Sequence, residues 1–259
     1  MCLRRLGLSF PLSAVALMLV ASVGFAGEPK TLGFRVPKGF EVTLYADDSL
    51  ATDIHMLTID SKGRVVVASK GYIKILHENE KTGIADKATL FADFPKSGAH
   101  GMVFDGDDLI CNGDQGVRRL YDTQGVGKCD KVSPPFFKTK NDGEHAANGI
   151  KRGPDGWFYM IAGNDAGIGE EHADGPGSPI KKPNAGAVVR FSPDGKTREV
   201  IAHGFRNPYD LAFNSTGHLF TVDADGERIH QMPYYAPTRL FDIAPGQHHG
   251  WLLPGWQRC

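Results

Sequence analysis

Two short polar segments lie directly before apolar strand patterns in this 259-residue chain. The first contains Glu144 and His145, and the second is the sequence RNPYD at 206–210, which precedes an apolar run from Leu211. Imidazole, guanidinium, amide and carboxylate groups that converge at a concave surface are typical of a site for a small polar molecule. A water-filled channel without a ligand would carry similar side chains, so that alternative stays open. The elements that carry the two segments decide whether they converge.

Four segments share one pattern: an apolar strand, a four-residue turn that ends in Gly or Asp, and a second apolar strand. Each is typical of a β-hairpin. Their first apolar residues are separated by 45, 48 and 61 residues, and they are Leu57, Met102, Ile150 and Leu211. Periods of about 40–50 residues with several strands per repeat are typical of a β-propeller. The sequence therefore predicts an all-β propeller, with a β-sandwich as the alternative.

The number of blades is harder to predict than the fold. A propeller ring closes with about four to eight blades, and this chain encodes four clear hairpins, an extra hairpin at 187–202 and the start of another. The pattern ends inside HHGWLLPGWQRC at 248–259. Because an open ring leaves apolar blade faces in water, we expect either a truncated six-bladed propeller or a partner that completes it.

The repeat register predicts a polar ring at one mouth of the central channel. The first strand of each blade lines the channel, so residues just before it lie at the same end. Two positions before each first apolar residue, the side chain is polar or aromatic: His55, His100, Asn148 and Tyr209. The ends of the second strands add Ser69, Lys70, Asp114, Gln115, Asn164, Asp165, Asp223 and Asp225.

Residues 1–26 have the pattern of a secretory signal peptide. Arg4 and Arg5 precede an apolar run that ends in small residues, so we expect cleavage after Ala26 and an exported domain over 27–259. An uncleaved membrane anchor is the alternative.

The charge balance and the cysteines limit the partners. With 29 basic and 30 acidic side chains and no basic block, nucleic acid and anionic membrane are not expected as partners. Export permits a disulfide, for which we consider Cys111 with Cys129, leaving Cys259 over. The sequence holds no C-x-x-C-H motif, so we expect no covalent haem.

Five segments occur in the order seen in a known family. They are GEHAANGIKRGPDGWFYMIAGN at 143–164, VVRFSPDG at 188–195, RNPYDLAF at 206–213, DADGE at 223–227 and GQHHGW at 246–251. Over Gly33–Trp251 the chain resembles the soluble quinoprotein glucose and sorbosone dehydrogenases, six-bladed propellers that bind pyrroloquinoline quinone (PQQ) and calcium. It resembles still more the exported membrane-bound dehydrogenase propellers of planctomycete-type bacteria.

The resemblance implies roles for individual residues. His145 would be the general base that removes the hydroxyl proton. Arg206 would pair with a carboxylate or quinone oxygen of the cofactor and stabilise developing negative charge. With the polar ring at the mouth, the expected cofactor-binding set is Glu144, Arg206, Asn207, His100 and Tyr209.

The resemblance also implies a calcium site in the loop after the next strand. Backbone oxygens at Asp225 and Gly226 would bind the ion, and Asp223 would add a carboxylate, since calcium prefers oxygen ligands. An acidic turn without metal is an equal alternative.

The segment 163–186 is rich in Gly, Asp and Pro, and we expect it to form a lid on the substrate side. His172 within it would be a ligand or a solvated loop histidine.

Together these features predict an exported sugar or alcohol dehydrogenase that transfers hydride from a hydroxyl carbon to bound PQQ. The resemblance implies a carbohydrate or alcohol substrate and a cytochrome as electron acceptor. The alternatives are a calcium-dependent gluconolactonase-like hydrolase and a propeller that binds without catalysis.

Overall fold

The computed structural model of the protein describes residues 32–140, 143–224 and 237–251. The chain divides into Met1–Thr43 and Leu44–Cys259. In the first unit, residues 32–43 are exposed and contain no strand. The second unit carries all the strands described and one short 3-10 helix, η1 (Glu170–His172). No helix within the described ranges is long and apolar enough to cross a membrane. The predicted signal peptide lies outside the described residues.

The first and third sheets are four-stranded meanders in which each strand pairs antiparallel with the next. The first consists of β1 (Met56–Ile59), β2 (Val65–Ser69), β3 (Tyr72–Asn79) and β4 (Ile84–Ala92). The third consists of β10 (Ala147–Arg152), β11 (Phe158–Ala162), β12 (Gly186–Phe191) and β13 (Arg198–Phe205). The extra hairpin predicted at 187–202 is therefore the outer half of the third sheet.

The second and fourth sheets follow the same meander. The second consists of β5 (Gly101–Asp105), β6 (Asp108–Gly113), β7 (Gly116–Tyr121) and β8 (Lys131–Val132), with β9 (Phe137–Lys138) also paired to β7. The fourth consists, in its described part, of β14 (Leu211–Phe213), β15 (Leu219–Ala224) and β16 (Thr238–Ile243).

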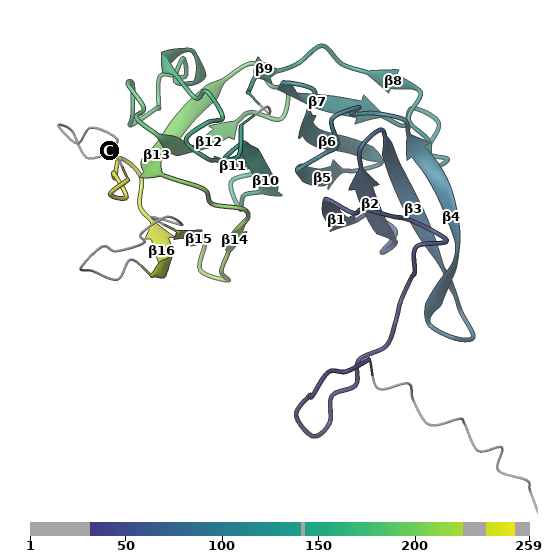
Figure 1. Ribbon diagram of the computed structural model, residues 1–259. Coiled ribbons are helices and arrows are strands. Elements are labelled where there is room, and N and C mark those ends of the chain that lie inside the picture. Colours follow the sequence, from purple (N-terminus) through teal and green to yellow (C-terminus); the bar gives the residue numbers. More distant parts are fainter. Residues whose placement is uncertain (1–31, 141–142, 225–236, 252–259) are drawn as a thin grey trace, which may run out of the picture. The chain divides into compact units, whose positions relative to one another are not determined.

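The first strands of the four sheets are neighbours in space, as expected for blades around a channel. Strand β1 contacts β5, β5 contacts β10, and β10 contacts β14 (Figure 1). The part of the chain that the structure describes thus forms four blades in a propeller arrangement, which confirms the predicted fold class.

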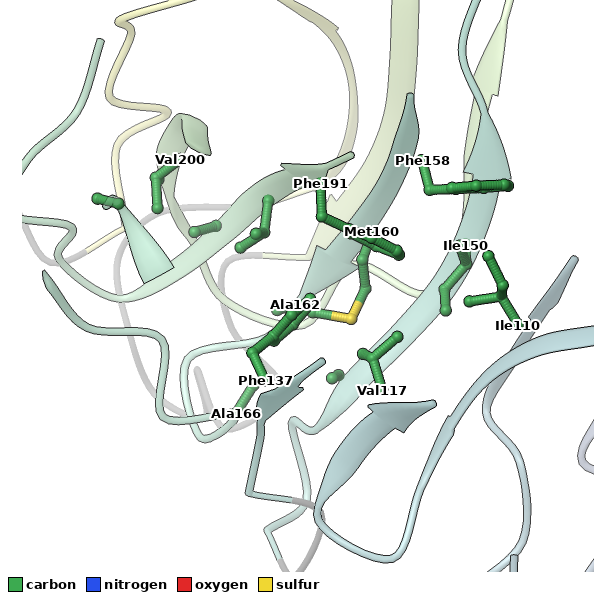
Figure 2. Close-up of a cluster of buried hydrophobic side chains, with 14 residues drawn as sticks. Ile110, Val117, Phe137, Ile150, Phe158, Met160, Ala162, Ala166, Phe191 and Val200 are labelled. Atoms are coloured by element: carbon green, nitrogen blue, oxygen red, sulfur yellow. The ribbon is translucent and has the colours of Figure 1, made fainter. Parts of the chain in front are cut away.

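The core consists of apolar layers between successive blades. Side chains alternate across a strand, so Leu109 of β6 packs in a cluster with the first sheet, while its neighbour Ile110 packs in a cluster with the third (Figure 2). In the same way, Met160 of β11 faces the second sheet and Ile161 faces the fourth. This two-sided burial explains why the inner strands β11 and β12 are apolar over most of their length instead of alternating with polar residues.

The disulfide considered between Cys111 and Cys129 is not formed, and both thiols are free. Cys111 is buried in the layer between the first two blades, and this burial raises the pKa of its thiol to about 12. A thiol held protonated in this way behaves as a small apolar core residue. Cys259 lies outside the described residues.

The insertion 163–186 differs from the predicted lid. Ile180 pairs with Val200 on the outer strand β13, and the Ser178 hydroxyl donates to the Ile180 carbonyl. His172 is buried, and both of its ring nitrogens have partners: Nε2 lies 2.8 Å from the Lys138 carbonyl oxygen, and Nδ1 accepts the Gly169 N–H at 3.0 Å. It is therefore neither a ligand nor a solvated loop residue. Most of the insertion covers the outer edge of the third blade, where unpaired backbone groups need partners.

Candidate functional site

A buried carboxylate holds the turn that carries Arg206 and Asn207. The backbone N–H groups of these two residues donate to Oδ2 and Oδ1 of Asp223, each at 2.8 Å. Asp223 lies on β15 and is 2% exposed. The next carbonyl in the turn, that of Pro208, accepts the Asn148 side-chain amide at 2.9 Å. The turn is thus fixed from both the third and the fourth blade.

His145 lies in the short segment before β10 and is 6% exposed. Its Nδ1 is 2.6 Å from Oδ1 of Asn164, and Nδ2 of Asn164 donates to Asp165 at 2.9 Å. Because that donation identifies Oδ1 as the acceptor oxygen, His145 must donate from Nδ1. A ring with a single proton therefore carries its lone pair on Nε2.

Two buried nitrogens in this region have no hydrogen-bond partner in the described part of the chain. They are Nε2 of His145 and Nε1 of Trp251. The indole of Trp251 faces the Arg206 guanidinium, with 5.6 Å from Cζ to the ring centroid. Since buried polar atoms are nearly always paired, unpaired nitrogens beside a histidine and an arginine indicate a place for a polar ligand.

His145 and Arg206 converge through a single residue. The backbone N–H of Asn164 donates to the Arg206 carbonyl at 2.8 Å, while the Asn164 side chain accepts from His145. The preceding Gly163 approaches so closely that a Cβ there would lie 2.5 Å from the His145 carbonyl oxygen. The close approach therefore requires glycine at this position. The contact runs through the Arg206 backbone, so the expectation from the repeat register that the two side chains meet at one channel mouth stays a prediction.

The predicted mouth residues of the other blades also meet. The rings of His55 and His100 stack with centroids 5.2 Å apart. Tyr209 of the fourth blade donates its hydroxyl to the His55 carbonyl at 2.7 Å. Burial lowers the pKa of His100, and His55 and Lys70 lower it further. His100 is therefore neutral near pH 7 and would contact a cofactor as a hydrogen-bonding group and not as a cation.

Glu144 is exposed, and within the described ranges its carboxylate has no hydrogen bond. The carboxylate near the imidazole belongs to Asp165, whose Oδ2 lies 3.7 Å from Nδ1 of His145. The assignment of Glu144 to cofactor binding stays a prediction. Two other predicted mouth residues form hydrogen bonds with backbone groups. Ser69 donates to the Asp53 carbonyl, and Asp114 accepts the Lys96 and Ser97 N–H groups.

Sequence reasoning missed Asn112, a fully buried residue of β6. Its Oδ1 accepts the N–H groups of His100 and Gly101, at 3.1 and 2.8 Å. Its Nδ2 donates to the Asn148 carbonyl at 2.8 Å. Asn112 thereby links the mouth segments of the second and third blades. Its signal in the sequence is an amide inside the apolar run LICNG.

Within the described residues, no cluster of side chains supports the predicted calcium site. Both Asp223 oxygens accept backbone N–H groups. No group of three or more His, Cys, Asp or Glu within 32–140, 143–224 and 237–251 could hold a metal. Asp225 and Gly226, the other predicted ligands, lie outside the described residues, so the calcium site stays a prediction.

Sequence comparison identifies one matching family. Residues 29–244 match a family described as Domain of unknown function (DUF7133). No curated protein matches the chain.

Several solved structures are similar in fold. One is the holo form of the pyranose dehydrogenase PQQ domain from Coprinopsis cinerea (TM-score 0.54, 12% identity, covering 74% of this chain and 51% of that one). Another is an oxidoreductase (glucose dehydrogenase) from Thermus thermophilus, with a TM-score of 0.54 and 22% identity, covering 76% of this chain and 63% of that one. A third is the PQQ-bound aldose sugar dehydrogenase from Streptomyces coelicolor, with a TM-score of 0.52 and 19% identity, covering 79% of this chain and 63% of that one. The chain thus spans less than two thirds of each, and identities this low support the fold alone.

Proposed function

This chain belongs to the DUF7133 family, matched over residues 29–244, and we propose that it is a dehydrogenase with its site at the propeller mouth. In this proposal it oxidises a sugar or alcohol hydroxyl, with PQQ as the hydride acceptor. When bound, the quinone would supply a two-electron acceptor for the hydride from the hydroxyl-bearing carbon. The hydroxyl proton goes to the protein, and the carbon becomes a carbonyl.

The observation that carries the proposal is the lone pair on Nε2 of His145. Its imidazole is buried, the Nδ1 proton is directed to Asn164, and Nε2 has no partner in the described structure. A neutral imidazole with a fixed tautomer is suited to accept a hydroxyl proton. Asp165 lies near enough, with 3.7 Å between its Oδ2 and Nδ1, to stabilise the imidazolium that forms.

Arg206 supplies the fixed positive charge of the site. The residue is buried, and its guanidinium lies against the Trp251 ring. A guanidinium held in place by a rigid turn can stabilise negative charge that develops as hydride arrives. The side chain of Asn207 is partly exposed beside it and would add an amide contact. His100 and Tyr209 would border the same cofactor.

Two of the similar structures are described as PQQ-containing. Together with the sequence motifs, this supports PQQ as the quinone. The geometry of the described residues gives no comparable support for calcium chemistry, so no step of the proposal uses a metal.

The test is turnover by purified full-length protein. With PQQ, added calcium and an aldose, it should reduce an acceptor dye, and omission of PQQ should abolish that activity. Lactone hydrolysis with calcium and without PQQ would contradict the proposal and support a gluconolactonase-like hydrolase. Neither activity, with PQQ bound, would favour a propeller that binds without catalysis.

We also propose that the protein is exported, on the pattern of residues 1–26. The mature protein recovered from outside the cytoplasm should then begin at Gly27, as determined by N-terminal sequencing. An intact Met1 in the cytoplasmic fraction would contradict export.

A further inference from the structure

We propose that Asp223 is a positioning residue that sets both halves of the site, the Arg206–Asn207 turn and the His145 imidazole. This role for the chain's own residues goes beyond the predicted metal ligation. Its significance for catalysis rests on the proposed function. The positioning itself does not, because it concerns hydrogen bonds within the protein.

The connection begins with the pair of hydrogen bonds that hold the Arg206–Asn207 turn against Asp223. Two consecutive peptide N–H groups, of Arg206 and Asn207, donate to different oxygens of one carboxylate, each at 2.8 Å. Hydrogen bonds to an ionised acceptor are stronger than neutral ones, and this one is 2% exposed. The carboxylate therefore fixes the direction in which the Arg206 side chain leaves the turn.

The second step passes from the turn to His145. The Arg206 carbonyl accepts the Asn164 N–H at 2.8 Å, and Asn164 Oδ1 accepts from His145 Nδ1 at 2.6 Å. Two residues, Arg206 and Asn164, thus connect the Asp223 carboxylate of the fourth blade to the His145 imidazole of the third blade. If the turn shifts, Asn164 must follow, and the contact that fixes the His145 tautomer is strained or lost.

A matched control exists in the second blade. Asp122 is 5% exposed, and its Oδ1 and Oδ2 accept the N–H groups of Val126 and Gly127, at 3.1 and 2.6 Å. It therefore has the same chemistry as Asp223: a buried carboxylate that binds two consecutive peptide groups. Substitution by asparagine keeps the shape at either position but replaces one acceptor oxygen with a nitrogen that cannot accept.

The experiment compares Asp223→Asn with Asp122→Asn in the full chain without quinone or substrate. Hydrogen exchange of the backbone amides and ¹⁵N signals of the imidazoles are measured. For Asp223→Asn, we expect exchange at Arg206 or Asn207 to accelerate about tenfold, the factor that corresponds to one lost hydrogen bond. The His145 signals should move from a single Nδ1–H tautomer toward a mixture. Asp122→Asn should accelerate exchange at Val126 or Gly127 and leave His145 unchanged.

Two results would overturn the proposal: unchanged His145 signals in Asp223→Asn, or an equal disturbance of His145 in Asp122→Asn. If Asp223→Asn does not fold, Asn164→Ala provides the test. That variant keeps the turn and the backbone bond to Arg206, so only the His145 signals should change. Unchanged His145 signals in Asn164→Ala would contradict the connection. A folded wild type that positions His145 but shows no turnover with PQQ would refute the proposed function and leave the positioning intact.

Discussion

Nδ1 of His145 lies 2.6 Å from the side-chain oxygen of Asn164, while the backbone N–H of Asn164 donates to the Arg206 carbonyl. Asn164 thereby contacts both His145, the expected general base, and the backbone of Arg206, the expected positive charge of the site. Asn164 also determines which ring nitrogen of His145 carries the lone pair, and the expected proton transfer to Nε2 depends on that tautomer.

Asn164→Ala should lower kcat about tenfold, because an imidazole without its partner samples the wrong tautomer. Steady-state dye reduction in PQQ-loaded protein measures the effect. Asn79→Ala is the control, since that amide contacts only the exposed Asp86 and the Lys81 backbone in the described structure. Equal kcat in both variants would show that Asn164 does not support the base.

Arg206→Lys should lower kcat by about 10-fold to 100-fold, because a lysine keeps the charge but lacks the planar fork and the stacking surface. The matched control is Arg152→Lys: Arg152 is a half-exposed residue of the third blade that forms an ion pair with Asp105 of the second blade. A lysine at 206 that retains full activity would mean that charge alone suffices there.

Asn112→Ala should destabilise the protein by about 3 kcal/mol, because the buried N–H groups of His100 and Gly101 and the Asn148 carbonyl lose their partner. The midpoint of urea unfolding measures this change. A loss below about 1 kcal/mol would indicate that water replaces the amide.

Stability should fall as the pH is lowered from about 7.5 to 5.5. Burial lowers the pKa of His203, and the adjacent His248 lowers it further; burial also lowers the pKa of His249. Each group gains its proton in the unfolded chain at a higher pH than in the folded one. The stabilisation is therefore complete above the unfolded pKa of about 6.5 and is lost as the pH falls through the folded pKa.

Thermal unfolding at several pH values measures this dependence. His203→Gln should flatten it, since glutamine does not titrate. A Tm that rises on acidification through this range would contradict the prediction.

The sequence predicted what depends on local pattern. Hairpin starts at Leu57, Met102, Ile150 and Leu211 were predictable because apolar runs and the turn residues between them are local signals. Repeat register also predicted that the segments of His145 and Arg206 are close, and Asn164 contacts the His145 ring and the Arg206 backbone.

What depends on distant contacts was not predictable. A segment rich in Gly, Asp and Pro has the same composition whether it is a lid or an edge cover, so the composition of 163–186 does not reveal that Ile180 pairs with Val200. An acidic residue near the end of a strand can bind a metal or accept hydrogen bonds from a turn, and Asp223 accepts the N–H groups of Arg206 and Asn207. Asn112 was missed because its three partners come from other segments.

The most direct test of the proposed function is a single-turnover measurement with full-length protein that has been loaded with PQQ and mixed with an aldose. Wild type should reduce the bound quinone. His145→Gln should bind the quinone equally well but reduce it about 100-fold or more slowly, while His218→Gln, at an exposed site on the fourth blade, should match wild type. Equal reduction rates in His145→Gln and wild type would contradict the role of His145 as the proton acceptor.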